Sequence, residues 1–191
     1  MRLVLASESP RRRQILKDAG FDYLVMPSKY NERPFSNQPV LTAKTFALGK
    51  AKDVFENLSF NQDCVVLGAD TVVYLNGQIL GKPQDEKQAR QMLLSLSNKV
   101  HSVVTGYCLY SKEQIIVDYD ESSVYFNQLT TNIIDAYIKS GLYKGKAGAY
   151  GIQDKQFSPV KSFSGSITNV IGLPIEKIKP ILTNMLKIDS K

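Results

Sequence analysis

The chain has 191 residues, of which 43% are hydrophobic and 22% are charged, and its formal net charge is +6. These values are ordinary for a globular protein, so they exclude a disordered or fibrous chain and predict one domain over residues 1–191. The basic excess fits an anionic partner, but it does not distinguish nucleic acid from a small phosphate compound.

Strands and helices are expected to alternate along the first half of the chain. The apolar run at residues 3–6 predicts the first strand, and it is too short for a signal peptide. The strand and helix signals in this half fall at residues 3–6, 9–19, 23–26, 40–55 and 64–67. No apolar run approaches the length of a membrane-spanning helix, so we expect a cytoplasmic protein without a membrane partner.

The second half begins with a hairpin signal and continues with long β-rich stretches. Asn76-Gly77 stands between the apolar residues 72–75 and 78–80, which is the strongest short signal for a hairpin. Helices are expected at residues 85–96 and 131–140 and after Gly172-Leu173-Pro174, and strands at residues 100–110 and 115–126. The pattern predicts a mixed α/β fold whose sheet is not purely parallel.

The scarcity of His and Cys limits the chemistry. The single His, His101, lies on an expected strand and favours a structural hydrogen bond, so acid, base or metal chemistry falls to carboxylates, Lys and Arg. Cys64 and Cys108 lie far apart in apolar runs and are interpreted as core residues, not as a disulfide or a metal site.

The start of the first helix is the first candidate site. Ser9 suits the N-cap and Pro10 the first helical position, and three arginines follow in a turn where basic charge opposes the helix dipole. Free backbone N–H groups, hydroxyls and guanidinium groups would form a phosphate cradle there from Ser7, Ser9, Arg11 and Arg12. Arginines that simply extend into solvent are the alternative.

The helix at residues 40–55 contains a lysine on its apolar face. At about 100° per residue, Lys50 falls near the middle of that face, whereas Lys52 points away. An inward lysine either reaches past the edge of the core or projects into a cleft that holds an anion. Both interpretations remain open from the pattern alone.

Asp70 is the strongest carboxylate candidate. It is expected at the end of the buried strand at residues 64–67, where Gly68 and Ala69 leave room for a ligand. A carboxylate there is costly unless it is paired or binds a metal, although a structural turn is the alternative. The hairpin would return Lys82 to the same neighbourhood, in a sequence that does not match a Walker loop.

A glycine-rich segment at residues 146–153 is the last candidate. Gly148 and Gly151 allow close backbone approach, and Gln153 offers both a donor and an acceptor, as recognition of a base would require. An ordinary Gly-rich turn would look the same. With Asp70 and Glu32 for a hard cation, the whole set suits a metal-dependent enzyme acting on a nucleotide.

Motifs in the right order resemble the Maf family of nucleoside triphosphate pyrophosphatases. They are Leu5 to Arg12, the loop with Glu32, Lys50-Ala51, Gly68-Ala69-Asp70-Thr71, Gly81-Lys82-Pro83, residues 96–106, Lys146 to Gln153, and residues 165–174. The resemblance implies hydrolysis of a nucleoside triphosphate between its α- and β-phosphates with a divalent cation, Mg²⁺ or Mn²⁺. It also implies an elongated twisted mixed sheet with flanking helices, similar to the inosine triphosphatases, with two lobes around a cleft. Family members often form dimers and have been linked to septum formation.

The resemblance also implies roles for individual residues. Asp70 is similar to the proton acceptor and, with Glu32, to the metal ligands. The phosphate, transition-state and other substrate ligands implied are Ser7, Ser9, Arg11, Arg12, Lys50, Thr71, Lys82, Lys146 and Gln153. Arg12, Thr71 and Gln153 resemble the branch that prefers dTTP and UTP, with CTP or modified pyrimidine nucleotides as further candidates.

Some positions depart from the family pattern. Asn98, Asn127, Leu142 and Gly145 replace residues common in the family, and the missing acidic groups bear on the metal site and not on the base. Two alternatives remain open. One is a nucleic-acid-binding protein, although no basic stripe with interleaved aromatics is evident, and the other is a regulatory protein that binds nucleotides without cleaving them.

Overall fold

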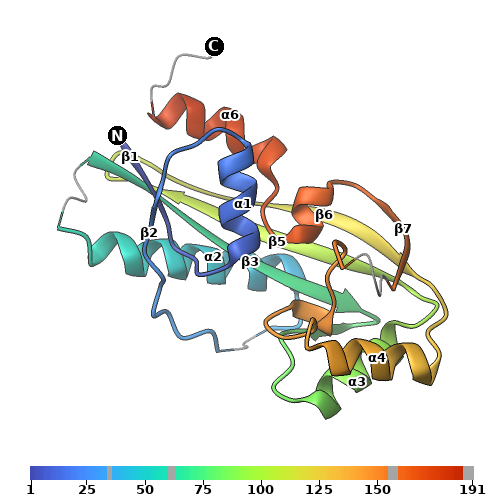
Figure 1. The fold of residues 1–191 in the computed structure, drawn as a ribbon. Helices are drawn as coiled ribbons and strands as arrows, with labels where there is room; N and C mark the ends of the chain where they lie inside the picture. The colour runs from blue at the N-terminus through green and yellow to red at the C-terminus, as the bar shows by residue number, and fades with distance from the viewer. Residues whose placement is uncertain (34–35, 60–62, 155–158, 187–191) are drawn as a thin grey trace.

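A seven-stranded mixed sheet runs the length of the molecule (Figure 1). The computed structural model describes residues 1–33, 36–59, 63–154 and 159–186. The strand order is β2-β1-β3-β5-β6-β7, with β4 paired to β3. The strands are β1 (Arg2–Leu5), β2 (Leu24–Val25), β3 (Cys64–Leu75), β4 (Gln78–Leu80), β5 (Val100–Tyr110), β6 (Ile115–Phe126) and β7 (Val160–Ser164). Pairing is parallel between β1 and its neighbours and antiparallel elsewhere, which confirms the mixed sheet.

The helices match the expected positions closely. They are α1 (Pro10–Asp18), α2 (Pro39–Glu56), α3 (Glu86–Leu96), α4 (Thr131–Ser140), α5 (Ile167–Ile171) and α6 (Ile175–Leu186), with a short 3₁₀ helix η2 (Ala147–Ala149). Ser9 caps α1 as predicted, because its hydroxyl accepts from the backbone N–H of Arg12. The short elements α5, η2 and β7 were not predicted. None of the helices within the described residues is long and apolar enough to cross a membrane.

Alternation along β3 assigns a different layer to each face of the sheet. Val65 and Leu67 pack in a core with α1 and α6, whereas Cys64 and Val66 pack against α2. Figure 1 shows α1 and α6 on the near side of the strands. Residues of β3 with even numbers therefore face α2, and those with odd numbers face the opposite side of the sheet, where α1 and α6 cover residues 65–69.

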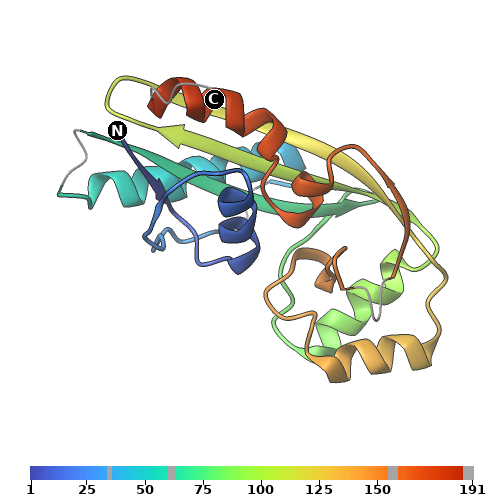
Figure 2. The ribbon, with the colours of Figure 1, turned by 45° about the horizontal axis from the view of Figure 1, so that its top comes forward.

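A second core forms the other lobe around the same sheet. There α3 and α4 pack against the C-terminal parts of β3 and β6 and the N-terminal part of β5. Val73, Val103 and Val124 are among the buried residues. Figure 2 shows these two helices together at one end of the molecule, away from α1 and α6. Two lobes thus share one continuous sheet.

The structure corrects the expected position of Asp70. This residue does not follow the strand but lies inside β3, a single strand of 12 residues. Gly68 also lies within the extended strand. A larger residue would not fit there because α2 crosses directly above it: a Cβ at Gly68 would lie 2.8 Å from the backbone nitrogen of Ala51. The glycine therefore serves close helix packing and not a turn.

Pairing on one edge of β3 is interrupted at the same place. The β1 pairs end at Leu67, and the β4 pairs begin at Val73. The predicted hairpin is confirmed, since Asn76 and Gly77 both have positive φ angles, +48° and +85°, between β3 and β4. The stretch of β3 around Asp70 consequently borders a gap between two strands that share one edge.

Candidate active site

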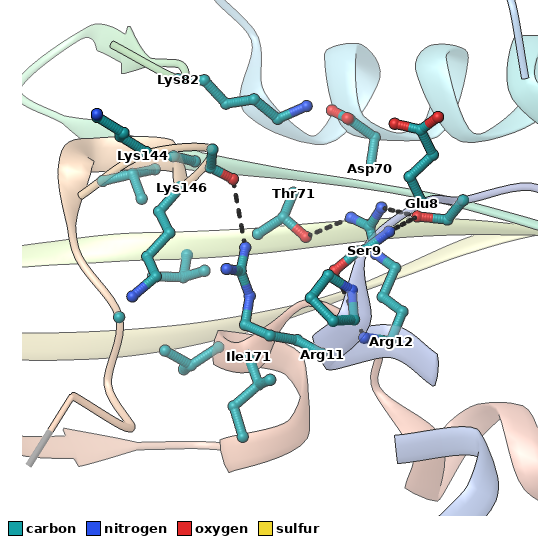
Figure 3. A pocket seen from close by; sticks show the side chains of 18 of the residues that line it. Glu8, Ser9, Arg11, Arg12, Asp70, Thr71, Lys82, Lys144, Lys146 and Ile171 are labelled. Atoms are coloured by element: carbon teal, nitrogen blue, oxygen red, sulfur yellow. Dashed lines mark hydrogen bonds between the residues drawn. The ribbon is translucent and has the colours of Figure 1, made fainter. Parts of the chain in front are cut away.

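A cavity of about 460 Å³ opens beside this stretch of β3, between the two lobes. The loop from β1 into α1 forms one wall, and the segment that follows α4 lies opposite (Figure 3). Every residue predicted for the site reaches the lining: Ser7, Ser9, Arg11, Arg12, Glu32, Lys50, Asp70, Thr71, Lys82, Lys146 and Gln153. The sequence segments therefore converge on one cleft.

Lys50 stands between two carboxylates at the base of this cavity. Its Nζ lies 2.7 Å from Asp70 Oδ1 and 2.6 Å from Glu32 Oε1. Asp70 has an even number and so faces α2, where Lys50 occupies the buried stripe that the helical period predicts. Lys52 is exposed and pairs with Glu56 on the helix surface instead, which confirms the difference predicted between the two lysines.

Burial and charge act against each other on the two carboxylates. Burial raises the pKa of Asp70, and the nearby Glu32 raises it further, while Lys50 and Arg12 oppose both effects. At Glu32 burial would also raise the pKa, but Lys50, Lys82 and Arg12 outweigh it, and the pKa is lowered. The pair therefore combines an acidic Glu32 with a more basic Asp70.

Arg12 joins three parts of the chain at the edge of the cavity. Its Nε donates to the Gly172 carbonyl at 2.8 Å, Nη1 to Ser7 Oγ at 3.1 Å and Nη2 to Thr71 Oγ1 at 3.1 Å. Thr71 also bonds Thr105, at 2.9 Å between their hydroxyl oxygens. Each terminal nitrogen of a guanidinium has two N–H groups, so one on each remains for a ligand after these bonds. Burial lowers the pKa of Arg12.

The two serines of the β1–α1 loop hold that loop in shape. Ser7 Oγ accepts from the backbone N–H of Ser9 at 3.2 Å, in addition to Arg12. The Ser9 hydroxyl is occupied by its capping bond to the N–H of Arg12, at 3.5 Å. Of the two, Ser7 is buried and Ser9 is half-buried at the helix start.

Two further cations, Lys82 and Arg11, line the cavity from opposite lobes. The side chain of Lys82, on the loop after β4, extends toward Asp70 (Figure 3). Arg11 reaches across the cavity and donates from Nη2 to the Gly145 carbonyl at 3.4 Å. Burial lowers the pKa of Arg11 although Asp154 and Tyr137 raise it. Positive groups thus surround the side of the cavity that faces Asp70.

Lys146 and Gln153 lie on the wall opposite Asp70. The ammonium of Lys146 is buried and forms an ion pair with Asp154, a residue that was not predicted. Gln153 lines the cavity and is exposed. Lys146 thus differs from Lys82, because it is held within the protein at the lining and does not extend toward Asp70 (Figure 3).

The carboxylates are suited to a magnesium or manganese ion held together with a ligand. Within the described ranges, no group of three or more His, Cys, Asp or Glu side chains is placed so that it could hold a metal ion. Glu32 and Asp70 nevertheless both reach one point, now taken by Lys50 Nζ, and both offer the oxygen ligands that such ions prefer. Mg²⁺ commonly binds through one or two carboxylates plus phosphates and waters. The donor set therefore fits an ion shared with phosphates.

His101 and the cysteines stay outside the cavity, as expected. His101 Nε2 lies 2.7 Å from the Tyr150 hydroxyl, and its ring packs edge-on against Phe126. Burial lowers the pKa of His101 to about 4, so the ring is neutral at physiological pH. Cys64 and Cys108 are buried, and neither forms a disulfide.

Several lining residues were missed from the sequence. Glu8 and Lys144 are exposed side chains at the cavity, and Val170 and Ile171 give it an apolar side. Glu8 lies within the motif from Leu5 to Arg12, but its carboxylate was not predicted to line the cavity. The two apolar residues belong to α5, whose five residues are too few to show a helical period.

Comparison with known proteins gives consistent matches over nearly the whole chain. The profile of a family described as Maf-like protein matches residues 2–185. A "dTTP/UTP pyrophosphatase" of Aquifex aeolicus is 45% identical over 97% of this chain and 96% of its own length. One of Pyrococcus furiosus is 44% identical over 91% and 90%. Among solved structures, the Staphylococcus aureus Ham1 protein has a TM-score of 0.49 and 16% identity over 66% of this chain and 72% of its own.

Proposed function

The chain belongs to the Maf-like protein family, and on that premise we propose that it hydrolyses dTTP and UTP to the nucleoside monophosphate and pyrophosphate. Relatives named for this activity match at 44 to 45% identity over at least 90% of their length. The observation that carries the proposal is Asp70, buried against Lys50 in a cavity with Arg11, Arg12 and Lys82.

In the proposed reaction, water attacks the α-phosphorus. The bond between that phosphorus and the oxygen bridging to the β-phosphate breaks, so pyrophosphate leaves and the monophosphate keeps the new oxygen. Asp70 accepts the proton of the attacking water. Because burial raises its pKa while Lys50 keeps it ionised, Asp70 is a stronger proton acceptor than an exposed aspartate.

The cationic side chains stabilise the negative charge that develops on the phosphates. Lys82 approaches Asp70 and would bind oxygens near the reacting phosphorus, while Arg11 and the free N–H groups of Arg12 would bind the leaving pyrophosphate. Arg11 and Arg12 are held by hydrogen bonds before a ligand arrives, so little reorganisation of these two groups accompanies the reaction. A divalent ion, Mg²⁺ or Mn²⁺, held by Glu32 and Asp70 would add charge neutralisation at the phosphates.

Base selection falls to the second lobe and the Arg12–Thr71 pair. Gln153 would bond the edge of the pyrimidine ring, since its amide both donates and accepts. Arg12 and Thr71 are bonded to each other at 3.1 Å and would act as one unit next to the sugar and base. Val170 and Ile171 would provide the apolar side on which a ring rests.

A panel of triphosphates tests the activity. We expect pyrophosphate release from dTTP and UTP, in the presence of Mg²⁺ or Mn²⁺, to exceed release from dATP and dGTP. Product analysis should show monophosphate and pyrophosphate, not diphosphate and phosphate. Binding of dTTP without any product would favour the regulatory alternative.

The wider setting of the activity stays a prediction. We expect a cytoplasmic enzyme, because its nucleotide substrates are present there. We also expect a homodimer, which light scattering would detect. A nucleic-acid partner is not expected, and filter binding that fell steeply with salt would argue otherwise. If the hydrolysis also serves septum formation, cells that carry only an inactive variant should show a defect in septum formation.

A further inference from the structure

The wall of the cavity opposite Asp70 is one segment, residues 145–154, which we call the wall segment. It is tied to both lobes, since Arg11 donates to the carbonyl of Gly145 at 3.4 Å and the N–H of Gly148 donates to the carbonyl of Gly81 at 3.1 Å. The second of these bonds lies next to Lys82 in the chain. A change in the conformation of the wall segment would therefore alter the positions of Arg11 and Lys82 in the cavity.

A buried cluster of Asp154, Lys146 and Tyr137 stabilises the wall segment. The carboxylate of Asp154 accepts from the ammonium of Lys146 and from the hydroxyl of Tyr137, which projects from α4. The side chains of Lys146 and Asp154 are only 10% and 7% exposed. Burying such a pair costs several kcal/mol unless its geometry and hydrogen bonds compensate, and here the Tyr137 hydroxyl adds a second hydrogen bond to the carboxylate.

The Tyr137 hydroxyl is the pivot of this group. It accepts from the N–H of Gly151 at 3.1 Å and donates to the carboxylate of Asp154. The N–H of Asp154 in turn donates to the carbonyl of Gly151 at 3.1 Å, which closes a turn over residues 151–154. Gln153 is carried by this turn, so one hydroxyl fixes both ends of the backbone that presents the Gln153 amide to the cavity.

Space around the turn is equally restricted. A Cβ at Gly151 would lie 2.7 Å from both Asp154 Oδ2 and Lys146 Nζ. A side chain there must displace one or both of these side-chain ends, because no real Cβ approaches so closely. The turn therefore depends on two separate features: the hydrogen bonds of the Tyr137 hydroxyl and the absence of a side chain at Gly151.

We propose that Tyr137 is a positioning residue that sets the base selectivity of the cavity by fixing the turn that carries Gln153. The inference rests on the proposed function and adds a determinant that does not touch the nucleotide. Thymine and cytosine differ at ring position 4, where one offers an acceptor and the other a donor. A turn with a fixed backbone limits where the Gln153 amide can reach and so favours one of the two rings, whereas on a loosened turn the amide can adjust to either.

The test compares Tyr137→Phe with Tyr143→Phe. Both tyrosines are buried in the core of the second lobe and neither lines the cavity, but it is the Tyr137 hydroxyl that bonds Asp154 and Gly151. In Tyr137→Phe we expect the ratio of kcat/KM for dTTP to that for dCTP to fall at least about tenfold, mostly through the KM for dTTP. The ratio in Tyr143→Phe should stay within about twofold of wild type. Thermal midpoints recorded alongside show whether each variant is folded.

Gly151→Ala provides a second perturbation that leaves the Tyr137 hydroxyl in place. We expect the same fall in the dTTP to dCTP ratio, and this variant decides the matter should Tyr137→Phe fail to fold. An unchanged ratio in a folded Tyr137→Phe or Gly151→Ala, or an equal fall in Tyr143→Phe, would overturn the inference alone. Failure of the wild-type chain to release pyrophosphate from any triphosphate would overturn the proposed function and the inference with it.

Discussion

Lys50 should contribute much more to stability than its neighbour Lys52. Lys50→Met keeps the unbranched stem but leaves Asp70 buried without its cation at 2.7 Å, with side-chain exposures of 10% and 8% for the pair. Removing one partner of a buried ion pair costs about 3–5 kcal/mol. For a chain of this size 1 kcal/mol shifts the melting temperature by about 2–4 °C, so we expect a loss of roughly 6–12 °C at the lower end of that cost.

Lys52→Met is the matched control on the same helix. Lys52 pairs with Glu56 at 3.7 Å, and both side chains are more than half exposed. Such a pair contributes about 0.3–0.5 kcal/mol, so its loss should shift the melting temperature by less than about 2 °C. Differential scanning calorimetry of both variants gives the comparison.

A double variant separates charge from packing. In Lys50→Met with Asp70→Asn, no buried carboxylate remains opposite the missing ammonium, so the double variant should be at least about 1 kcal/mol more stable than the two single losses predict. Equal melting temperatures for Lys50→Met and Lys52→Met would refute the reasoning. Strict additivity in the double variant would show that Lys50 acts by packing and not by its charge.

Two further predictions concern the scaffold. Gly68→Ala should lower the free energy of unfolding by about 1–3 kcal/mol because its methyl group meets the α2 backbone, whereas Gly81→Ala, with nothing within 4 Å, should change it little in urea titrations. His101 has a folded pKa of about 4, below its unfolded value near 6.5, so the unfolded state binds the proton first and stability falls as pH drops below about 6.5. Between pH 7 and pH 5 this loss is about 2 kcal/mol, and His101→Gln should remove it; the same pH slope in that variant would contradict the assignment.

The elements predicted well are those whose signals are local. The inward Lys50 follows from the helical period alone, and the hairpin follows from two residues that tolerate positive φ. The N-cap at Ser9 likewise depends on its own turn. In each case the tertiary environment agrees with the local preference.

The elements predicted poorly depend on contacts between distant segments. Gly68 looks like the end of a strand in sequence, but it lies mid-strand because α2 passes over it. Asp154 carries no pattern that connects it to Tyr137, 17 residues away. The sequence therefore indicates most of the groups that line the cavity, but not those that hold the lining in place.

Hydrolysis of dTTP in ¹⁸O-labelled water by the wild-type chain and by Asp70→Asn tests the central claim most directly. In Asp70→Asn the Lys50 ammonium keeps Glu32 at 2.6 Å, so the variant should fold. We predict that the wild-type chain places the label in thymidine monophosphate and none in pyrophosphate, and that Asp70→Asn gives no turnover. Label in pyrophosphate would contradict attack at the α-phosphorus, and wild-type turnover by Asp70→Asn would contradict its role as the base.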